Sequence, residues 1–553
     1  MYTSDNRSAV YLIDAEDKIE NFVSMVFSEL RDPDDPSFRM LRSILSTIAN
    51  NVEEAITIVI EAEYVDRIYR DCYYNHLSSK RTEVSRFCKR LFLFDGDYFD
   101  ILDNREFSEE VGANIIGTIV VKPIEVGAIG RTLVRPKYLL DSKQYLCRTT
   151  NYKATLYGHK MLFRAFPFSM QDGETLTCAE ITILNLLDYY SNHFNDYKFA
   201  LPSDITKVMN QNGHERALPA HGMSFPMISK TLFAFGFFPR LYFSTNELSP
   251  FQLKRLLHYY VESGIPVAVG TENENGDLHS VLVIGFKKYE RSWERIINEN
   301  NVVLQSEKLG KTSENSRRFY MYDVADSCTE YVMIDDHIRP YSCYNYIKQN
   351  GKYLLNNSRV RCIAVPLYKR MYLEALDARS IAKVFLSDSA PKLISIYKRA
   401  RPHIEGDKEI GTKENPLIIR LFLASSSTYL EDRWGQGIDN DVIKNIWLNA
   451  SFSHFLWICE LYDKASLERG KTIGELVLDA TASEVDKSSS IILFRFFDRI
   501  SVRNRWGEMN STIWAESNEI NQESVDSSPQ DMIMHGVEQG MEISMFSSVF
   551  VNC

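Results

Sequence analysis

The sequence predicts an α+β protein with several domains, and three observations support this prediction. At 553 residues, the chain is too long for a single hydrophobic core, so two to four domains are expected. Hydrophobic residues make up 44% of the chain and charged residues 25%, the composition of an ordinary globular protein. Apolar residues recur at helical spacing from about residue 15 to 95, and strand-like runs begin at about residue 112.

Residues 1–110 are expected to form a helical region and residues 111–164 a β-rich segment, so that the N-terminal part as a whole is helical and β. Apolar residues lie on one helix face in Glu16–Leu30 and again in Met40–Ile60. The β-rich segment contains strand-like runs separated by Gly and Pro. These runs are Asn114–Pro123, Gly130–Pro136, Tyr152–Tyr157 and Met161–Phe168.

Residues 165–370 are expected to form a separate domain that begins with a helix. Its helix-patterned run is Cys178–Tyr190, and later strand-like runs are Pro266–Gly270, Ser280–Phe286 and Tyr331–Ile334. The charged stretch 287–328 separates the last two strands. Because long insertions in surface loops cost little stability, this stretch is expected to be such an insertion.

The C-terminal part of the chain is expected to contain a mixed α/β domain over 371–510, followed by a tail. Helix-like and strand-like runs alternate in this region, among them Leu417–Ala424, Phe455–Tyr462 and Ile491–Phe497. Residues 511–553 are rich in Ser, Glu and Met, so the tail is expected to be partly disordered.

Charge and cysteine usage argue against several classes of protein. The net charge of -11 and the pI near 5.6 give no indication of a nucleic-acid partner or of a membrane surface. The nine cysteines are scattered without a CxxC pair, which argues against a zinc ribbon. An odd cysteine count and an N-terminus unlike a signal peptide predict reduced thiols in the cytoplasm. Neither a metal nor a cofactor is expected.

Four residue types in a particular order point to nucleophilic catalysis by a thiol. Cys178 opens the apolar helix, where the helix dipole favours a thiolate. His279 opens a strand after a polar turn, and Asp335 ends another strand with Asp336 beside it. Gln171 precedes the cysteine by seven residues. Each residue alone is most often structural, but the order Gln, Cys, His, Asp supplies an oxyanion donor, a nucleophile, a base and an orienting carboxylate.

Residues 165–345 resemble the papain-like superfamily of cysteine peptidases, and within it the peptidases that cut double-glycine leaders from bacteriocins. The resemblance rests on short motifs that follow one another along the chain in the order found in those peptidases. They are Gln171 with Cys178 and Tyr189-Tyr190, Gly222–Phe225 with Phe235–Phe237, Gly264–Val267, His279–Phe286 and Tyr331–Asp335. The resemblance covers about a third of the chain, and it implies a helix bundle packed on an antiparallel sheet.

The resemblance implies an intracellular thiol peptidase that acts on a protein or peptide substrate. Cys178 is expected to attack the amide carbonyl, His279 to transfer the proton, and Asp335, or alternatively Asp336, to orient His279. Gln171 and the main-chain N–H of Cys178 are expected to stabilise the oxyanion. The flanking regions are expected to recognise a regulatory protein or to form a homo-oligomer. A transglutaminase-like acyl transferase and a catalytically inactive scaffold are the alternatives.

Overall fold

The structure is a computed structural model, and its described residues fall into two compact units. It describes residues 8–27, 34–81, 83–212, 218–219, 222–245, 248–299, 305–308, 318–350, 352–402, 408–435, 450–483, 487–497, 499–503 and 509–513. Unit 1 comprises Met1–Leu253, Ile265–Lys287 and Glu330–Tyr368, and unit 2 comprises Lys254–Gly264, Lys288–Thr329 and Lys369–Cys553. The N-terminal segments and the candidate site therefore belong to the same unit.

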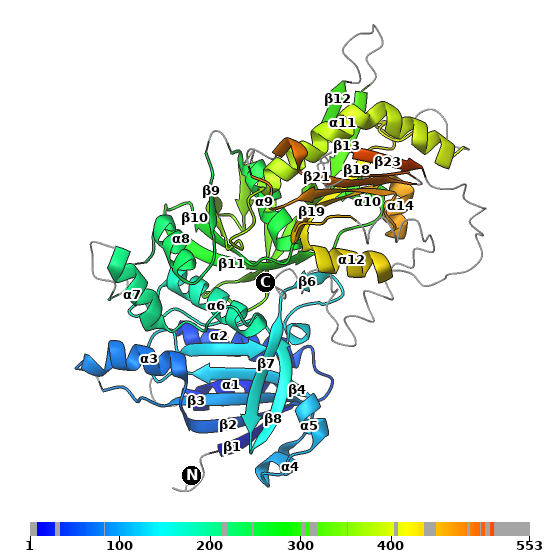
Figure 1. Ribbon diagram of the computed structural model, residues 1–553. Helices are drawn as coiled ribbons and strands as arrows, with labels where there is room; N and C mark the ends of the chain where they lie inside the picture. Colours follow the sequence, from blue (N-terminus) through cyan, green and yellow to red (C-terminus); the bar gives the residue numbers. More distant parts are fainter. Residues whose placement is uncertain are drawn as a thin grey trace. The chain divides into compact units, whose positions relative to one another are not determined.

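The N-terminal part of unit 1 is a five-stranded antiparallel sheet covered on both faces. Its strands follow chain order: β1 (Ser8–Ile13), β2 (Ile56–Tyr64), β3 (Cys88–Asp95), β4 (Ile115–Val121) and β5 (Ile129–Val134). One face carries α1 (Glu16–Val26) and α2 (Pro36–Ala49), and the other carries the hairpin β7 (Thr150–Leu156) and β8 (His159–Ala165) (Figure 1). Apolar residues of the hairpin share one core with the sheet. Three further helices lie at the margins: α3 (Arg67–Asn75), α4 (Phe99–Asp103) and α5 (Glu109–Ala113).

The prediction of a helical region over residues 1–110 is wrong in part, because three strands lie there. The predicted helix Met40–Ile60 ends at Ala49, and Ile56–Tyr64 is the strand β2. The first five residues of β2 are all buried. A short apolar run that is buried on both faces has no alternation, so periodicity does not distinguish it from a buried helix.

The second part of unit 1 combines three helices with an antiparallel sheet. The helices are α6 (Cys178–His193), α7 (Pro202–Asn212) and α8 (Phe225–Ala234). The sheet has the order β16 (Lys352–Leu355), β15 (Ser342–Gln349), β14 (Glu330–Ile334), β11 (Leu278–Lys287), β10 (Val267–Glu272), β17 (Arg359–Val365), β9 (Arg240–Phe243), and β6 (Tyr145–Cys147) also pairs with β11. Helices together with antiparallel sheets confirm the α+β class. The papain-like assignment stays a prediction.

The helix α6 is buried between the two parts of unit 1, where it packs against β11 and β7 (Figure 1). Every residue from Ala179 to Tyr190 is buried. Asp188 on this helix accepts two hydrogen bonds from Arg131 of β5, with N–O distances of 2.7 and 2.9 Å. A bidentate ion pair of this kind fixes orientation as well as distance, so α6 is held in a defined position on the N-terminal sheet.

Unit 2 is built on a sheet of its own, which is mostly antiparallel. Its order is β12 (Gln305–Lys308), β13 (Arg318–Asp323), β18 (Leu417–Ser425), β19 (Phe455–Tyr462), β20 (Gly474–Asp479), β21 (Ile491–Phe496), β22 (Arg499–Arg503), β23 (Met509–Ile513). Helices of this unit are α10 (Trp293–Glu299), α11 (Ala375–Ala400), α12 (Ser426–Gly435), α14 (Lys464–Arg469) and the part of α9 (Pro250–Glu262) from Lys254 on. Of the runs that the sequence leaves open between helix and strand, Leu417–Ala424 lies in β18, Phe455–Tyr462 forms β19, and Ile491–Phe497 contains β21. The predicted tail begins within β23, and residues 514–553 lie outside the described residues.

The prediction that 287–328 is a surface-loop insertion is wrong. Within this stretch β13 pairs in parallel with β18, at the interior of the unit 2 sheet. Trp293, Ile296 and Tyr322 are buried in one apolar cluster. The many charged residues around them conceal this short apolar pattern in the sequence.

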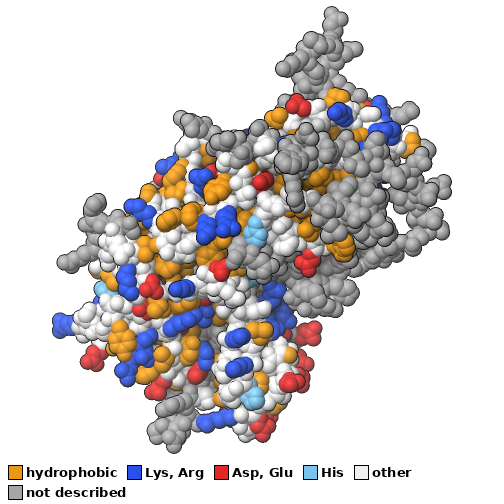
Figure 2. All heavy atoms as spheres, viewed as in Figure 1, with side chains coloured by type: hydrophobic (Ala, Val, Ile, Leu, Met, Phe, Trp, Pro, Cys, Tyr) orange, Lys and Arg blue, Asp and Glu red, His pale blue; other side chains and the backbone are white. Residues whose placement is uncertain are grey.

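Two surface properties are apparent from the described residues. No helix among them is both long and apolar enough to cross a bilayer. On the face shown in Figure 2, basic, acidic and hydrophobic side chains of the N-terminal sheet region lie interspersed. In this region of the pictured face, the described side chains form no wide patch of a single charge.

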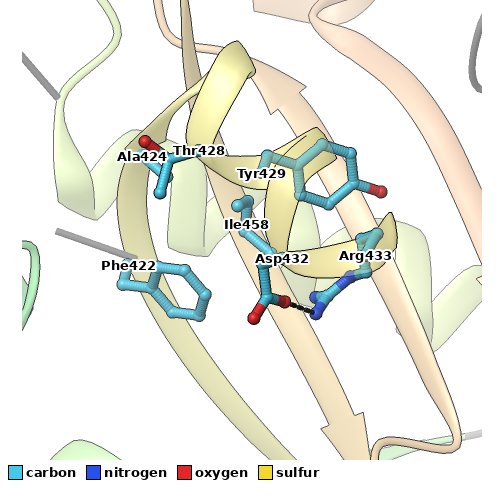
Figure 3. A pocket seen from close by; sticks show the side chains of 7 residues that line it. All are labelled: Phe422, Ala424, Thr428, Tyr429, Asp432, Arg433 and Ile458. Carbon is cyan, nitrogen blue, oxygen red and sulfur yellow. Dashed lines mark hydrogen bonds and ion pairs between the residues drawn. The ribbon is translucent and has the colours of Figure 1, made fainter. Parts of the chain in front are cut away.

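A row of buried and half-buried charges crosses the sheet of unit 2. Arg420, Glu460, Glu475 and Arg495 stand opposite one another on four successive strands. Arg433 of α12 lies over the two glutamates, 3.1 Å from Glu460 and 2.7 Å from Glu475. It also meets its neighbour Asp432, and both side chains lie beside the apolar residues Phe422 and Ile458 (Figure 3). Buried charges of this kind are tolerated only when each has a partner.

We expect Arg433→Met to destabilise unit 2 by about 3–5 kcal/mol, because it leaves two buried carboxylates without their shared cation. The measurement is the unfolding midpoint in guanidinium chloride. Arg295→Met is the matched control, since Arg295 is 69% exposed in its pair with Glu290, and such pairs contribute little. Equal midpoints for the two variants would contradict the prediction.

Candidate active site

The loop before α6 is held by the side chain of Asp172. Its Oδ1 accepts main-chain N–H groups from Glu174 at 3.0 Å, Thr175 at 2.7 Å and Leu176 at 2.9 Å. A carboxylate that binds three successive N–H groups fixes a tight turn. The chain therefore enters α6 at Cys178 along a defined path.

Cys178 is the first residue of α6, and its side chain is half-buried. Thr177 caps the helix, and Glu180 accepts the main-chain N–H of Thr177 at 3.2 Å. The first N–H groups of a helix have no partner within the helix and carry the positive end of its dipole. The thiol thus lies where negative charge on sulfur, or on an oxygen beside it, is stabilised.

Two neighbouring strands position His279 and its carboxylate partner. His279 lies near the start of β11, opposite Thr271 of β10. Asp335 directly follows β14, which pairs antiparallel with β11. The ring Nε2 of His279 lies 2.9 Å from Oδ1 of Asp335, and the side chain of Cys178 is near enough to the ring to raise its pKa. Cys178, His279 and Asp335, which the sequence singled out, are therefore brought together.

The charge state of this group follows from its contacts. Burial lowers the pKa of His279, but the hydrogen bond to Asp335, the nearby Cys178 side chain and the charges of Asp335 and Asp336 outweigh it and raise the pKa to about 10. Burial raises the pKa of Asp335, but the His279 hydrogen bond and charge, then the Tyr344 hydroxyl, bring it below its ordinary value. The pair is therefore imidazolium and carboxylate at neutral pH.

Asp335 and Asp336, which the sequence left as alternatives, occupy different positions. Asp336 Oδ1 is 3.7 Å from Nε2 of His279, beyond hydrogen-bonding distance. Neither oxygen of this buried carboxyl has a hydrogen-bond partner among the described residues. Burial raises the pKa of Asp336, and the charge of Asp335 raises it further, against the lowering effect of His279. The hydrogen bond to the imidazole belongs to Asp335.

Gln171 lies against a residue that the sequence analysis did not single out. Its Nε2 is 2.7 Å from Nε2 of His337. The His337 ring in turn stacks on the His279 ring, with centroids 4.5 Å apart and an interplanar angle of 9°. The only signal in the sequence was a third polar side chain directly after Asp335 and Asp336.

Three side chains of this site are of types that can bind a metal ion. His279, Asp335 and His337 each offer a ligand atom, and the three atoms lie within 4.8 Å of one another. The lone pairs of an imidazole lie in the ring plane, and the two rings are nearly parallel. Their lone pairs therefore run side by side rather than converge on one ion. The arrangement fits a hydrogen-bonded stack of rings better than a metal centre.

No protein-family model, curated protein or solved structure matches this chain. The chemistry of the site is therefore argued from its own residues. A thiol at a helix N-terminus, beside a protonated imidazole that is hydrogen-bonded to a carboxylate, is suited to acyl transfer through sulfur.

We expect the stability of the protein to fall between pH 6.5 and 10, because the pKa of His279 is raised from 6.5 to about 10 on folding. The stabilisation is fully present below the lower value and is lost as the folded ring deprotonates. Asp335→Asn removes the partner carboxylate, so its deficit in unfolding free energy should be large at pH 6 and small at pH 10. Denaturant titrations at both pH values measure this difference. A deficit that does not change with pH would contradict the assignment.

Proposed function

We propose that the protein is a thiol peptidase that hydrolyses a peptide or isopeptide bond, with Cys178 as nucleophile. The observation that carries the proposal is the hydrogen bond between His279 and Asp335, with Cys178 near enough to the same ring to raise its pKa. The three residues come from a helix start, a strand start and a strand end that lie far apart in the chain.

The proposed reaction begins with the Cys178 thiolate, which the neighbouring imidazolium stabilises. Sulfur attacks the carbonyl carbon, and the C–N bond breaks as His279 gives its proton to the leaving amine. The product is a thioester on Cys178. His279, now neutral, takes a proton from water as the water oxygen attacks the thioester, which releases the carboxylic acid and the thiolate.

Asp335 has the role of orienting the imidazole. Its Oδ1 accepts from Nε2 of His279, so Nδ1 is the ring atom left to exchange a proton with sulfur and the amine. The carboxylate is itself held from two other sides, by the hydroxyl of Tyr344 and by the main-chain N–H of His337 at 3.0 Å. A carboxylate with fixed partners keeps the ring in one tautomer and one orientation.

Two donors are available to the oxyanion that forms during attack. The first is the main-chain N–H of Cys178 in the first turn of α6, where N–H groups have no helical partner. The second is the side-chain amide of Gln171, on the loop that enters the helix. Removing one such donor typically costs about 10²–10³ in kcat.

Cys178→Ala should abolish cleavage and the modification of residue 178 by iodoacetamide, because the nucleophile is gone. Peptide mass spectrometry locates the modified cysteines, and product masses distinguish added water from a joined amine. Cys343→Ala is the matched control, because Cys343 is an exposed free thiol outside the proposed series. If Cys178→Ala still cleaves substrate, the peptidase proposal fails.

Asp335→Asn should lower kcat/KM by about 10²–10⁴, because an amide in place of the carboxylate favours the wrong ring tautomer. Asp336→Asn should cost much less, since its oxygen is 3.7 Å from the imidazole. The two variants carry the same substitution at adjacent positions, so each serves as the other's control. A larger loss in Asp336→Asn would transfer the orienting role to Asp336.

A further inference from the structure

We propose that His337 is a positioning residue that links the oxyanion donor Gln171 to the base His279. This inference rests on the proposed peptidase function, and it adds a residue that neither the sequence pattern nor the three-residue series requires. His337 would accept one N–H of the Gln171 amide and leave the other N–H for the oxyanion.

Three contacts place His337 at the centre of the site. Its ring stacks on His279 at 4.5 Å and 9°. Its Nε2 lies 2.7 Å from the amide nitrogen of Gln171. Its main-chain N–H donates to Oδ1 of Asp335 at 3.0 Å. One residue thus touches the base, the orienting carboxylate and the oxyanion amide.

The atoms in contact determine where the protons are. An amide nitrogen only donates hydrogen bonds, so Nε2 of His337 must accept with its lone pair. The ring is then neutral, with its proton on Nδ1. An amide carries two N–H groups, and using one on His337 fixes the plane of the amide and the direction of the second. A freely rotating glutamine would lose this direction.

The charged groups around His337 act in opposite directions. In the described part of the chain, those that face its ring are His279, stacked on it, and Asp336, whose Oδ2 is 3.9 Å from Nε2; Asp335 is bound to its main chain. The imidazolium of His279 disfavours a second positive charge, and Asp336 favours one. A proton on Nε2 would remove the lone pair that Gln171 uses and direct the ring toward Asp336.

A purely structural role for this side chain fits poorly with its exposure. The His337 side chain is 56% exposed on a turn, so it covers little apolar surface and its removal should leave the unfolding midpoint nearly unchanged. An effect on turnover without an effect on stability would therefore report on positioning.

Three substitutions in the full-length protein separate the two properties of the ring. His337→Phe keeps an aromatic ring for stacking but has no acceptor, His337→Gln keeps an acceptor without the ring, and His337→Ala has neither. We expect kcat to fall about tenfold or more in the Phe and Ala variants with KM little changed, and His337→Gln to recover part of the loss. The unfolding midpoint and the rate of Cys178 alkylation should stay near wild type in all three.

The coupling to Gln171 is tested by a double-mutant cycle on kcat. Adding His337→Phe to Gln171→Ala should cost little more than Gln171→Ala alone, because the acceptor then has no amide to hold. Independent, multiplying losses would overturn the inference, as would a His337→Phe variant with a wild-type kcat. Both outcomes differ from failure of the proposed function, in which the wild-type protein itself shows no cleavage that depends on Cys178.

Discussion

The hydrogen bond between His279 and Asp335 is the interaction on which the rest of the site depends. A half-buried imidazole would ordinarily lose its proton, because burial lowers the pKa of a cationic group. A carboxylate 2.9 Å away reverses this effect, and antiparallel pairing of β11 with β14 supplies the carboxylate. The charge state of the ring is thus a consequence of strand pairing. The thiol at the start of α6 meets an imidazole that already carries its proton.

The parts of the fold that the sequence predicted well are those with one dominant physical signal. The run Ser280–Phe286, which follows a polar turn, predicts a strand, and it lies in β11 with every residue buried. Cys178, His279 and Asp335 each lie at the end of an element, where Cys178 and His279 are half-buried and Asp335 is buried. Order along the chain and position at an element's end were sufficient to group these three.

The features that the sequence did not predict depend on tertiary contacts. The sequence of Ile56–Tyr64 fits a helix as well as a strand. Its pairing with β1 and β3 determines that it forms a strand. Trp293 occupies a core position within a charged stretch. The place of His337 over His279 depends on the conformation of one turn after β14, and no periodic pattern encodes it. For the same reason the partner of Gln171 was not foreseeable, although Gln171 itself was.

The N-terminal sheet takes part in building the site rather than standing apart from it. The main chain of Phe168 exchanges two hydrogen bonds with that of Thr132, a residue of β5. The N–H of Met170 donates to the carbonyl of Ile129, also in β5, at 3.0 Å. The chain therefore runs along the edge of this sheet up to the residue before Gln171. Gly127, with φ of +64°, lies so close to the Gln171 carbonyl that a Cβ would be 1.8 Å from its oxygen. Because the backbone of Gln171 is held by the sheet and its amide by His337, the direction of the proposed oxyanion donor is set from both ends. A region that the sequence assigned to a flank thus fixes a residue of the proposed catalytic machinery.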